Sequence, residues 1–297
     1  MVAAATVRRQ EVTRATAALA AVCAAAVLTA GCGGSGVAAE RPAGDGKAPV
    51  VPASTVAGAA DALVRAGSSQ VTTSMRMASG GTWLTITGSG DFDFARRQGE
   101  LTLVLPKDAA GAEEHRPITE LLLPGALYMK DRGEGVPAGK WVRVDTTRLA
   151  DGNLVTGGAT EPLAAAELLR GAQAVTYVGE ETLRGTKVRH YRGVADIARA
   201  ARAEGTAGGP GGSPLAAAAK GFTVTSVPFD AWLDAQGRLR QVSQQFTFSS
   251  AGARESAGQN VTVVSTTRFD RFGTPVSVIM PRPADIWTGK IVSRQAG

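Results

Sequence analysis

The sequence predicts an α+β fold built on one curved antiparallel sheet of about ten or eleven strands, with short helices on one of its sides. Two observations support this prediction. Segments of strand length with alternating apolar and polar residues recur at hairpin spacing over most of the chain, and only short helical patterns interrupt them. Strands and helices do not alternate regularly, which argues against a parallel sheet. A sheet of this width cannot stay flat, so we expect it to curve.

The strands are recognised by apolar side chains at every second position. The clearest case is the segment 91–94, in which Phe92 and Phe94 share one face. The segments interpreted as strands are residues 71–77, 82–87, 91–94, 99–105, 118–123, 127–130, 140–145, 175–180, 187–194, 222–234, 239–248, 261–272 and 275–279. Because most of them follow one another across short turns, we expect neighbours in sequence to pair as hairpins.

Three short helical patterns lie between the strands. The first begins at Ser54, whose side chain suits an N-cap, and ends at Gly67. The second follows Thr160 as its N-cap and ends at Gly171, and the third covers residues 196–203. All three are too short to form a separate helical domain, so we expect them to pack on the sheet.

The composition leaves little material for catalytic or metal chemistry. The chain has 44% hydrophobic and 20% charged residues, two cysteines and two histidines, His115 and His190. Two cysteines exclude a disulfide scaffold or a Cys-rich zinc module. His190 lies in a predicted strand without an indicated Ser or Cys partner, and His115 lies in a polar loop segment. We therefore expect no catalytic residue, no metal site and no cofactor.

The first 31 residues have the organisation of an export signal. Arg8, Arg9 and Arg14 form a basic start, and residues 15–30 follow without a charge. Sixteen such residues fall short of the roughly 20 that a membrane-spanning helix needs. The sequence Leu-Thr-Ala-Gly-Cys that ends at Cys32 resembles a bacterial lipobox, in which the cysteine receives a diacylglycerol thioether. The alternative is an ordinary secretory signal with a chance cysteine.

These features define the expected domain organisation and location. Residues 1–31 are a lipoprotein signal peptide, residues 32–54 are a flexible Gly-, Ala- and Pro-rich tether, and residues 55–297 are the folded domain. Two acyl chains on Cys32 are sufficient for stable attachment, so we expect the protein on the extracytoplasmic face of the cell membrane. The basic residues are dispersed, which makes nucleic acid an improbable partner.

Beyond these local patterns, the chain resembles a family of envelope proteins. The segments that carry the resemblance are LYMKDRGEGVPAGKWVRVD (127–145), GEETLRGTKVRHYRGVADI (179–197), FDAWLDAQGRLRQV (229–242) and FDRFGTPVSVIMP (269–281). Together with the lipobox and tether they are similar to actinobacterial LppX/LprG-type lipoproteins and, more distantly, to the LolA/LolB-like lipid carriers. The resemblance implies a half-barrel of about eleven strands, helices on its concave side, and an apolar cavity for acyl chains.

On this basis we expect a non-enzymatic lipoprotein that binds and carries a lipid or acylated glycolipid. The residues expected on the inner face, as candidate ligand contacts, are Phe92, Phe94, Leu101, Leu103, Leu105, Leu121 and Leu123. Residues 215–221, with the Gly-rich run before them, are expected to form a mobile flap over the opening. The same apolar residues would equally make a packed core. A sensor or adaptor module of the same fold, with an envelope protein as its partner, is the alternative function, and a hydrolase is disfavoured by the missing nucleophile motifs.

Overall fold

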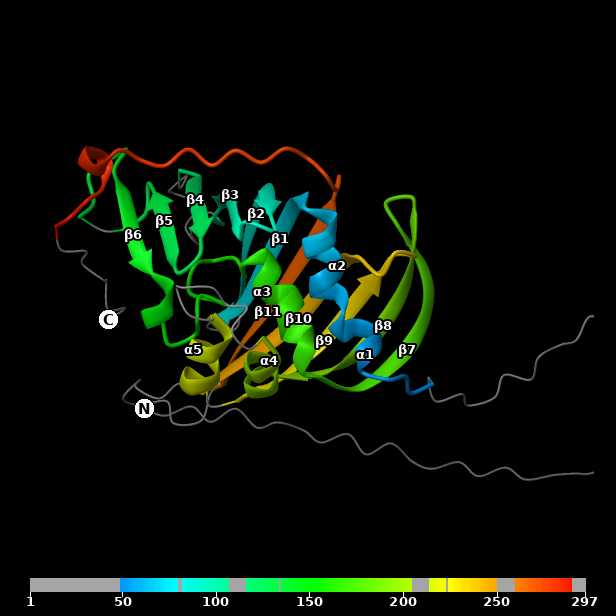
Figure 1. Ribbon diagram of the computed structural model, residues 1–297. Helices are drawn as coiled ribbons and strands as arrows, with labels where there is room; N and C mark the ends of the chain where they lie inside the picture. Colours follow the sequence, from blue (N-terminus) through cyan, green and yellow to red (C-terminus); the bar gives the residue numbers. More distant parts are fainter. Residues whose placement is uncertain are drawn as a thin grey trace, which may run out of the picture. The chain divides into compact units, whose positions relative to one another are not determined.

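Eleven strands form a single antiparallel sheet in the part of the chain that the structure describes (Figure 1). The structure is a computed structural model, and it describes residues 49–79, 82–106, 116–133, 135–204, 214–222, 224–249 and 260–289. The strands are β1 (Ser68–Ser79), β2 (Thr82–Asp93), β3 (Gln98–Val104), β4 (Ile118–Leu123), β5 (Ala126–Lys130), β6 (Trp141–Asp145), β7 (Ala172–Leu183), β8 (Thr186–Asp196), β9 (Ser226–Leu233), β10 (Leu239–Ser249) and β11 (Asn260–Asp270). This confirms the predicted fold class.

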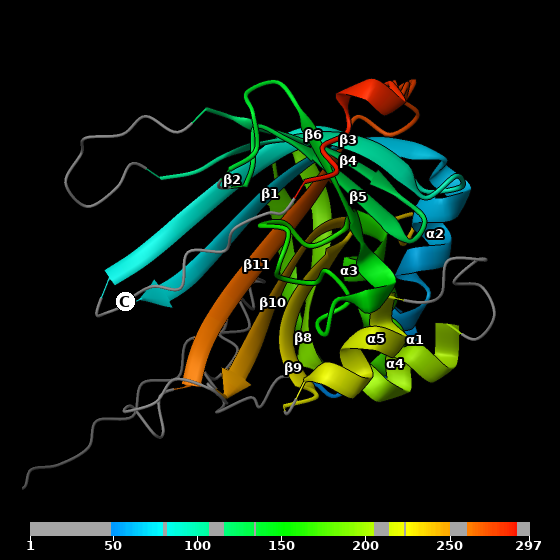
Figure 2. The same ribbon diagram turned by 90° about the vertical axis from the view of Figure 1, so that its left-hand side faces the viewer.

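The strand order across the sheet is β6-β5-β4-β3-β2-β1-β11-β10-β9-β8-β7. Strands adjacent in sequence pair with each other within two series, β1 to β6 and β7 to β11. The two series are joined where β1 pairs with β11, from Gln70 opposite Asp270 to Met77 opposite Val263. The outermost strands, β6 and β7, remain edges, so the sheet is a half-barrel rather than a closed barrel. The sheet curves strongly, and the helices lie on its concave side (Figure 2).

The register of each strand pair decides which side chains face the helices. Leu101 lies opposite Glu120, and Leu103 lies opposite Ile118. Side chains directly opposite each other point to the same face of a sheet, so these four share the concave face. The burial of β3 alternates in the same phase, because Leu101 and Leu103 are buried whereas Thr102 is exposed.

Short helices cover the concave face. They are α1 (Ser54–Ala57), α2 (Ala59–Ala66), α3 (Pro162–Glu167), α4 (Ile197–Glu204) and α5 (Pro214–Gly221), with 3-10 turns η1 (Thr146–Arg148) and η2 (Leu168–Gly171). A further 3-10 turn, η4 (Pro283–Asp285), lies near β6 at the edge of the sheet. α2 ends at Gly67, whose φ of 82° is favourable for glycine. Among the described residues, none of these helices has both the length and the apolar character required for a membrane span.

Two helix starts differ from the prediction. The N-cap of α1 is Ala53 rather than Ser54, which is the first helical residue. The N-cap of α3 is Glu161, whose carboxylate accepts hydrogen bonds from the backbone N–H groups of Leu163 and Ala164. Thr160, the predicted cap, instead uses its hydroxyl to donate to a backbone carbonyl. A longer acidic side chain directly before Pro162 therefore takes the role that the sequence analysis gave to threonine.

The amino-terminal flank pairs with one edge of the sheet. Val50 forms an isolated antiparallel bridge with Thr176 of β7, and the Val51 N–H donates to the Val175 carbonyl at 2.9 Å. These residues lie in the segment that the sequence analysis assigned to the tether. The folded unit thus begins before residue 55, because edge pairing is a backbone interaction that side-chain patterns do not reveal.

The carboxy-terminal flank reaches the opposite edge. Residues 275–279, predicted as a strand, have no regular secondary structure, so that prediction is wrong. The chain continues along the rim of the sheet (red in Figure 1) to Ile286, which forms a parallel bridge with Trp141 of β6. The Trp287 N–H donates to the Trp141 carbonyl at 2.7 Å. Residues 275–279 have an alternating pattern but pair with no strand, and the chain pairs with the sheet only at Ile286.

Candidate functional site

The candidate site is the concave face of the half-barrel, and its centre is aromatic. The ring centroids of Phe92 and Phe94 lie 5.5 Å apart, and those of Phe94 and Phe269 lie 6.0 Å apart, in tilted arrangements. All three side chains are fully buried. Tilted aromatic contacts add roughly 1 kcal/mol each to the burial of the rings. Phe92 and Phe94 are therefore on the predicted face, while their contact with a ligand remains a prediction.

The predicted leucines of β3 also lie on this face. Leu101 and Leu103 are fully buried, and Leu105, directly after the strand, is partly buried against the same core. Their register with β4 brings them beside Ile118 and under the helices. Their role as ligand contacts also remains a prediction.

The predicted placement of Leu121 and Leu123 on the inner face is wrong. Leu121 lies opposite Glu100 of β3 and Tyr128 of β5, on the convex side of the sheet. Leu123, two positions further along β4, is on the same face as Leu121 and also lines a small hollow at the end of the strand. The β4 sequence Ile-Thr-Glu-Leu-Leu-Leu contains three consecutive leucines, so alternation alone does not fix its phase. Pairing of Leu122 with Gly99 fixes it.

The space between the sheet and its helical cover is filled. A cavity wide enough for an acyl chain would also admit water-sized spheres, so its lining side chains would have accessible surface. Leu101, Leu103 and Phe92 on the sheet are 0% exposed, as are Ala164 and Leu168 on the cover. The concave face is therefore a packed core in this structure, which is the alternative that the sequence left open.

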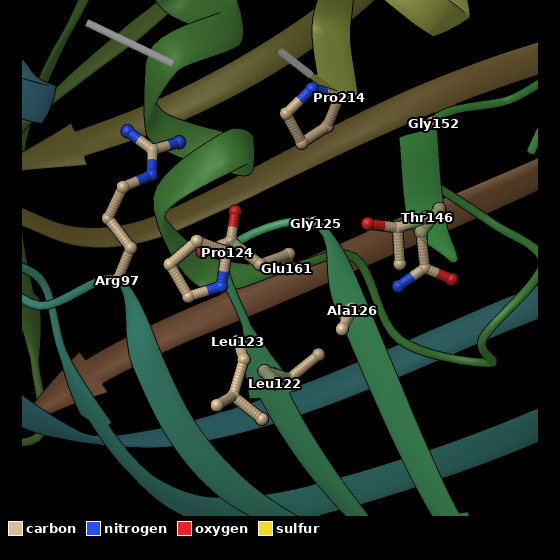
Figure 3. Close-up of a pocket in the computed structure, with 11 residues that line it drawn as sticks. Arg97, Leu122, Leu123, Pro124, Gly125, Ala126, Thr146, Gly152, Glu161 and Pro214 are labelled. Atoms are coloured by element: carbon tan, nitrogen blue, oxygen red, sulfur yellow. The ribbon is translucent and has the colours of Figure 1, made fainter. Parts of the chain in front are cut away.

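One small hollow lies at the rim of the half-barrel, where the β4–β5 turn approaches the start of α5 (Figure 3). Its volume is about 30 Å³, enough for one or two water molecules but not for an acyl chain. Its lining includes Arg97, Leu122, Pro124, Thr146, Glu161 and Pro214. The hollow thus combines apolar groups from the sheet with charged and polar groups from the turns.

α3 forms the centre of the cover and packs closely on the sheet. Ala164, Ala165 and Ala166 are fully buried, and their small side chains allow the helix backbone to approach the strands. Gln244 of β10 is also buried, and its amide donates to the Ala165 carbonyl at 2.8 Å. A polar side chain on the concave face is thereby satisfied by the cover.

Arg97, in the β2–β3 turn, joins the cover to the sheet. Its guanidinium donates two hydrogen bonds of 2.8 Å to Glu167 of α3 and lies 3.6 Å from Glu204 of α4. Burial disfavours its charge, but the bonds to Glu167 and the nearby Glu161 and Glu204 raise the pKa of Arg97 overall. Burial raises the pKa of Glu161 to about 7, although Arg97 acts in the opposite direction. We call these four residues the Arg97 cluster, and its net charge depends on pH near neutrality.

Glu120 is a second buried acid, on the concave face of β4. It is 1% exposed, and its Oε1 atom lies 3.8 Å from the Arg132 guanidinium without a hydrogen bond from the described residues. Burial raises the pKa of Glu120 to about 8, against the attraction of Arg132. The side chain is therefore mostly protonated at pH 7. Arg132 donates to the backbone carbonyls of Thr156 and Gly157, which holds that loop beside the rim.

None of these charged residues was predicted from the sequence. Glu120 lies between Ile118 and Leu122 on an otherwise apolar face, but the pairing of β4 with β3, not the sequence of β4, places it there. No local signal links Arg97 to Glu167, which are 70 positions apart in the sequence. Their contact follows from the tertiary arrangement of a turn and a helix.

His190 belongs to a network on the convex face of the sheet. Its Nδ1 lies 2.7 Å from Glu181, and its Nε2 lies 2.6 Å from Asp230. The Trp232 ring stacks on the imidazole at 4.3 Å, and its Nε1 donates to Glu181 at 2.9 Å. Both imidazole nitrogens thus lie within hydrogen-bond distance of a carboxylate. We interpret this network as a structural bridge between β7, β8 and β9.

Several predicted features fall outside the described residues. Cys32, the predicted lipidation site, is one of them, and so are His115 and most of the Gly-rich run before α5. α5 itself, predicted as part of a flap, buries Leu215 and Ala218 against the fold. Among the described residues, no group of three or more His, Cys, Asp or Glu side chains is arranged to hold a metal ion.

Comparisons with known proteins give likeness at the level of the fold. No protein-family model matches the sequence. No curated protein matches it either. Among solved structures, the chain is similar to the Mycobacterium tuberculosis lipoprotein LppX, with 11% identity, a TM-score of 0.40, and coverage of 76% of this chain and 97% of LppX.

It is also similar to LprF from Mycobacterium bovis, with 14% identity, a TM-score of 0.38, and coverage of 78% and 96%. A LolA superfamily protein from Nitrosomonas europaea shares 11% identity with a TM-score of 0.29, over 73% of this chain and 90% of that protein.

Proposed function

We propose that this protein is a non-enzymatic lipoprotein of the cell envelope that holds the acyl chains of a lipid or lipidated glycan between its half-barrel and the helical cover. No cofactor takes part. The observation that carries the proposal is the apolar concave face, which is closed by separate short helices rather than by a second sheet. In this proposal Cys32 anchors the chain to the outer side of the cell membrane through its diacylglycerol group.

Because the interior is filled, a lipid has to displace part of the cover. α5 buries two of its eight residues, Leu215 and Ala218, whereas α3 buries all six of its residues. Burial of two such side chains is worth roughly 3 kcal/mol. Burial of roughly four acyl methylene groups, at about 0.8 kcal/mol each, offsets that loss. We therefore expect α5 to move when a lipid enters.

The groups around the small hollow suit the head group of such a lipid. Arg97, Thr146 and Asn153 line the hollow next to Pro214, the first residue of α5. Movement of α5 would open the hollow toward the concave face. The Thr146 hydroxyl and the Asn153 amide are appropriate partners for sugar hydroxyls. The acyl chains would then lie against Phe92, Phe94, Leu101, Leu103 and Leu105.

The alternative is an envelope sensor or adaptor that uses the same fold to bind a protein partner. The observation that favours it is the packed concave face, because a module that holds no ligand needs no space there. In that case the helical cover stays in place, and the interaction surface lies on the outside of the fold.

Native mass spectrometry tests the two proposals. The folded unit, residues 46–297, is exported from an actinobacterial host without the acylated cysteine, so that it encounters envelope lipids but has no anchor. The carrier proposal expects a population with an added lipid mass that is lost on activation in the gas phase. A protein that is empty under all extraction conditions contradicts the carrier proposal and favours the adaptor.

A further inference from the structure

Four long strands extend past the helices at one end of the half-barrel. Figure 2 shows β1, β2, β10 and β11 projecting beyond the helical cover. Large apolar side chains at this end are exposed: Trp83 is 51% exposed, Leu84 39% and Val261 38%. We call this end the lip and define it by Arg76, Met77, Trp83, Leu84 and Val261. Single exposed apolar residues are common, but a group of them on adjacent strands marks an interaction surface.

The lip is apolar on both faces of the sheet. Met77 lies opposite Leu84 and opposite Val263, which is buried on the concave face. Trp83 pairs with Ala78, and both side chains are on the convex face of the sheet. The Arg76 guanidinium lies 4.9 Å from the centre of the Trp83 ring.

Nearer the middle of the same strands, the convex face is polar. Its side chains there are Thr72, Ser74, Thr87, Ser89, Thr102, Ser243 and Thr266. The solvated face of an antiparallel sheet commonly carries polar side chains, so the group of apolar side chains at the lip marks a surface of a different kind.

Among the described residues of the strands that form the lip, the charge favours an anionic surface. The described residues within 70–90, 241–249 and 260–267 contain one charged side chain, Arg76. The acidic residues of β1, β2 and β11 lie at the other end of the sheet, as Asp91, Asp93 and Asp270. Tryptophan and arginine beside aliphatic side chains are the residues that occupy the interface of a bilayer, where the ring and the alkyl stem are buried and the polar group stays hydrated. A cation near anionic lipids adds about 1 kcal/mol.

We propose that the lip is a membrane-docking surface, seated in the interface of a bilayer that contains anionic lipids. On the concave side, Leu84 leads to Ile86 and Met75, which pair with each other deeper in the same face. The docked lip thus connects the acyl region of the bilayer with the concave face of the half-barrel. It gives the proposed ligand a direct apolar route under the cover.

Vesicle sedimentation tests this proposal with residues 46–297, which form the folded unit and carry no anchor. The vesicles are phosphatidylcholine with and without phosphatidylglycerol. We expect the unaltered protein to bind the phosphatidylglycerol vesicles, and the double variant Trp83→Ser with Leu84→Ser to bind roughly tenfold or more weakly. The matched control is Ile279→Ser with Met280→Ser, which removes two exposed apolar residues from the carboxy-terminal segment and should change binding less than roughly twofold.

A second variant separates the charge from the apolar contact. Arg76→Glu should lower binding to phosphatidylglycerol vesicles and remove most of its dependence on salt, while leaving the fold unchanged by circular dichroism. Failure of the unaltered protein to bind either vesicle, or equal binding by the lip variant and the control, overturns the proposal. These outcomes are independent of lipid loading, because an empty protein in native mass spectrometry contradicts the carrier function without affecting vesicle binding.

Discussion

Arg97 and Glu167 form a bidentate ion pair, with two hydrogen bonds of 2.8 Å, between the β2–β3 turn and helix α3. The pair is largely withdrawn from water, with side-chain exposures of 17% and 4%. Two further carboxylates, Glu161 and Glu204, depend on the same guanidinium. Removal of one cation therefore leaves several buried acids without compensation.

Replacement of Arg97 by alanine should destabilise the fold by roughly 3–5 kcal/mol at pH 8, because uncompensated buried charge is strongly unfavourable. The loss should be smaller at pH 5.5, where Glu161 is protonated at little cost. Urea unfolding at the two pH values measures this. The control is Arg96→Ala, which removes an exposed arginine from the same turn and should change stability by less than about 0.5 kcal/mol. Equal effects of the two substitutions would contradict a joining role for Arg97.

Glu120 should make the protein less stable as the pH rises. The pKa of Glu120 is about 8 in the folded state, against 4.5 for a glutamate in water, so the folded state binds the proton more tightly. The free energy of unfolding consequently falls from about pH 4.5 to about pH 8 and is level above that. Glu161 acts in the same direction up to about pH 7.

The substitution Glu120→Gln should remove the contribution of Glu120 from about pH 4.5 to about pH 8 and leave the slope of Glu161 up to about pH 7, and the variant should be more stable than the unaltered protein at pH 9. Urea unfolding over this pH range is the measurement. An unchanged pH profile would show that Glu120 is not the buried acid responsible.

Leu103→Trp should block lipid loading if the concave face holds the ligand. The larger side chain enters a filled core and should also lower stability by about 1–3 kcal/mol. The matched control is Thr102→Trp, one position away, which points to the convex face and is exposed. Native mass spectrometry should show reduced lipid occupancy for Leu103→Trp and normal occupancy for Thr102→Trp. Normal lipid occupancy in both variants would show that the ligand does not bind against β3.

His190→Phe should lower stability without affecting lipid occupancy. The substitution removes the ring nitrogens that lie within hydrogen-bond distance of Glu181 and Asp230, so both carboxylates lose a partner. A loss of roughly 2–3 kcal/mol is expected, as for hydrogen bonds to charged partners. Thermal unfolding together with native mass spectrometry separates the two effects. A change in occupancy at unchanged stability would assign the network a role in ligand binding.

Hydrogen exchange should distinguish the parts of the cover. Amides of α5 should exchange faster than those of η2, because α5 buries Leu215 and Ala218 whereas η2 buries Leu168 and Leu169 next to the fully buried α3. Loading with lipid should change exchange in α5 first. Equal protection in the two elements would contradict the proposed movement of α5.

The sheet could be predicted from the sequence because each strand carries its own signal. Alternating residues such as Leu101 and Leu103 specify both the strand and its buried face, and short turns specify the neighbour. The signal failed at β4, where consecutive leucines leave the phase open, and at residues 275–279, where an extended segment lacks a partner of its own. In both cases the answer depends on pairing with another part of the chain.

The candidate site was less accessible to prediction. Apolar residues on a concave face have the same pattern whether they line a cavity or fill a core, so periodicity did not decide between the two. The Arg97 cluster joins a turn to two helices that are distant in the sequence, and no local pattern describes it. Glu120 could be recognised as a charge at an inward position once the phase of β4 is known. Its raised pKa could not be predicted, because it depends on burial by the surrounding residues.

The bridges at Val50 and Ile286 cover the two edge strands of the sheet, β7 and β6. Each occupies hydrogen-bonding groups on an outer strand that would otherwise be available to another chain. An open half-barrel is vulnerable to edge-to-edge aggregation, and here the flanks of the same polypeptide protect both edges. Shortening either flank would expose a template for aggregation, even though every residue of the sheet itself would still be present.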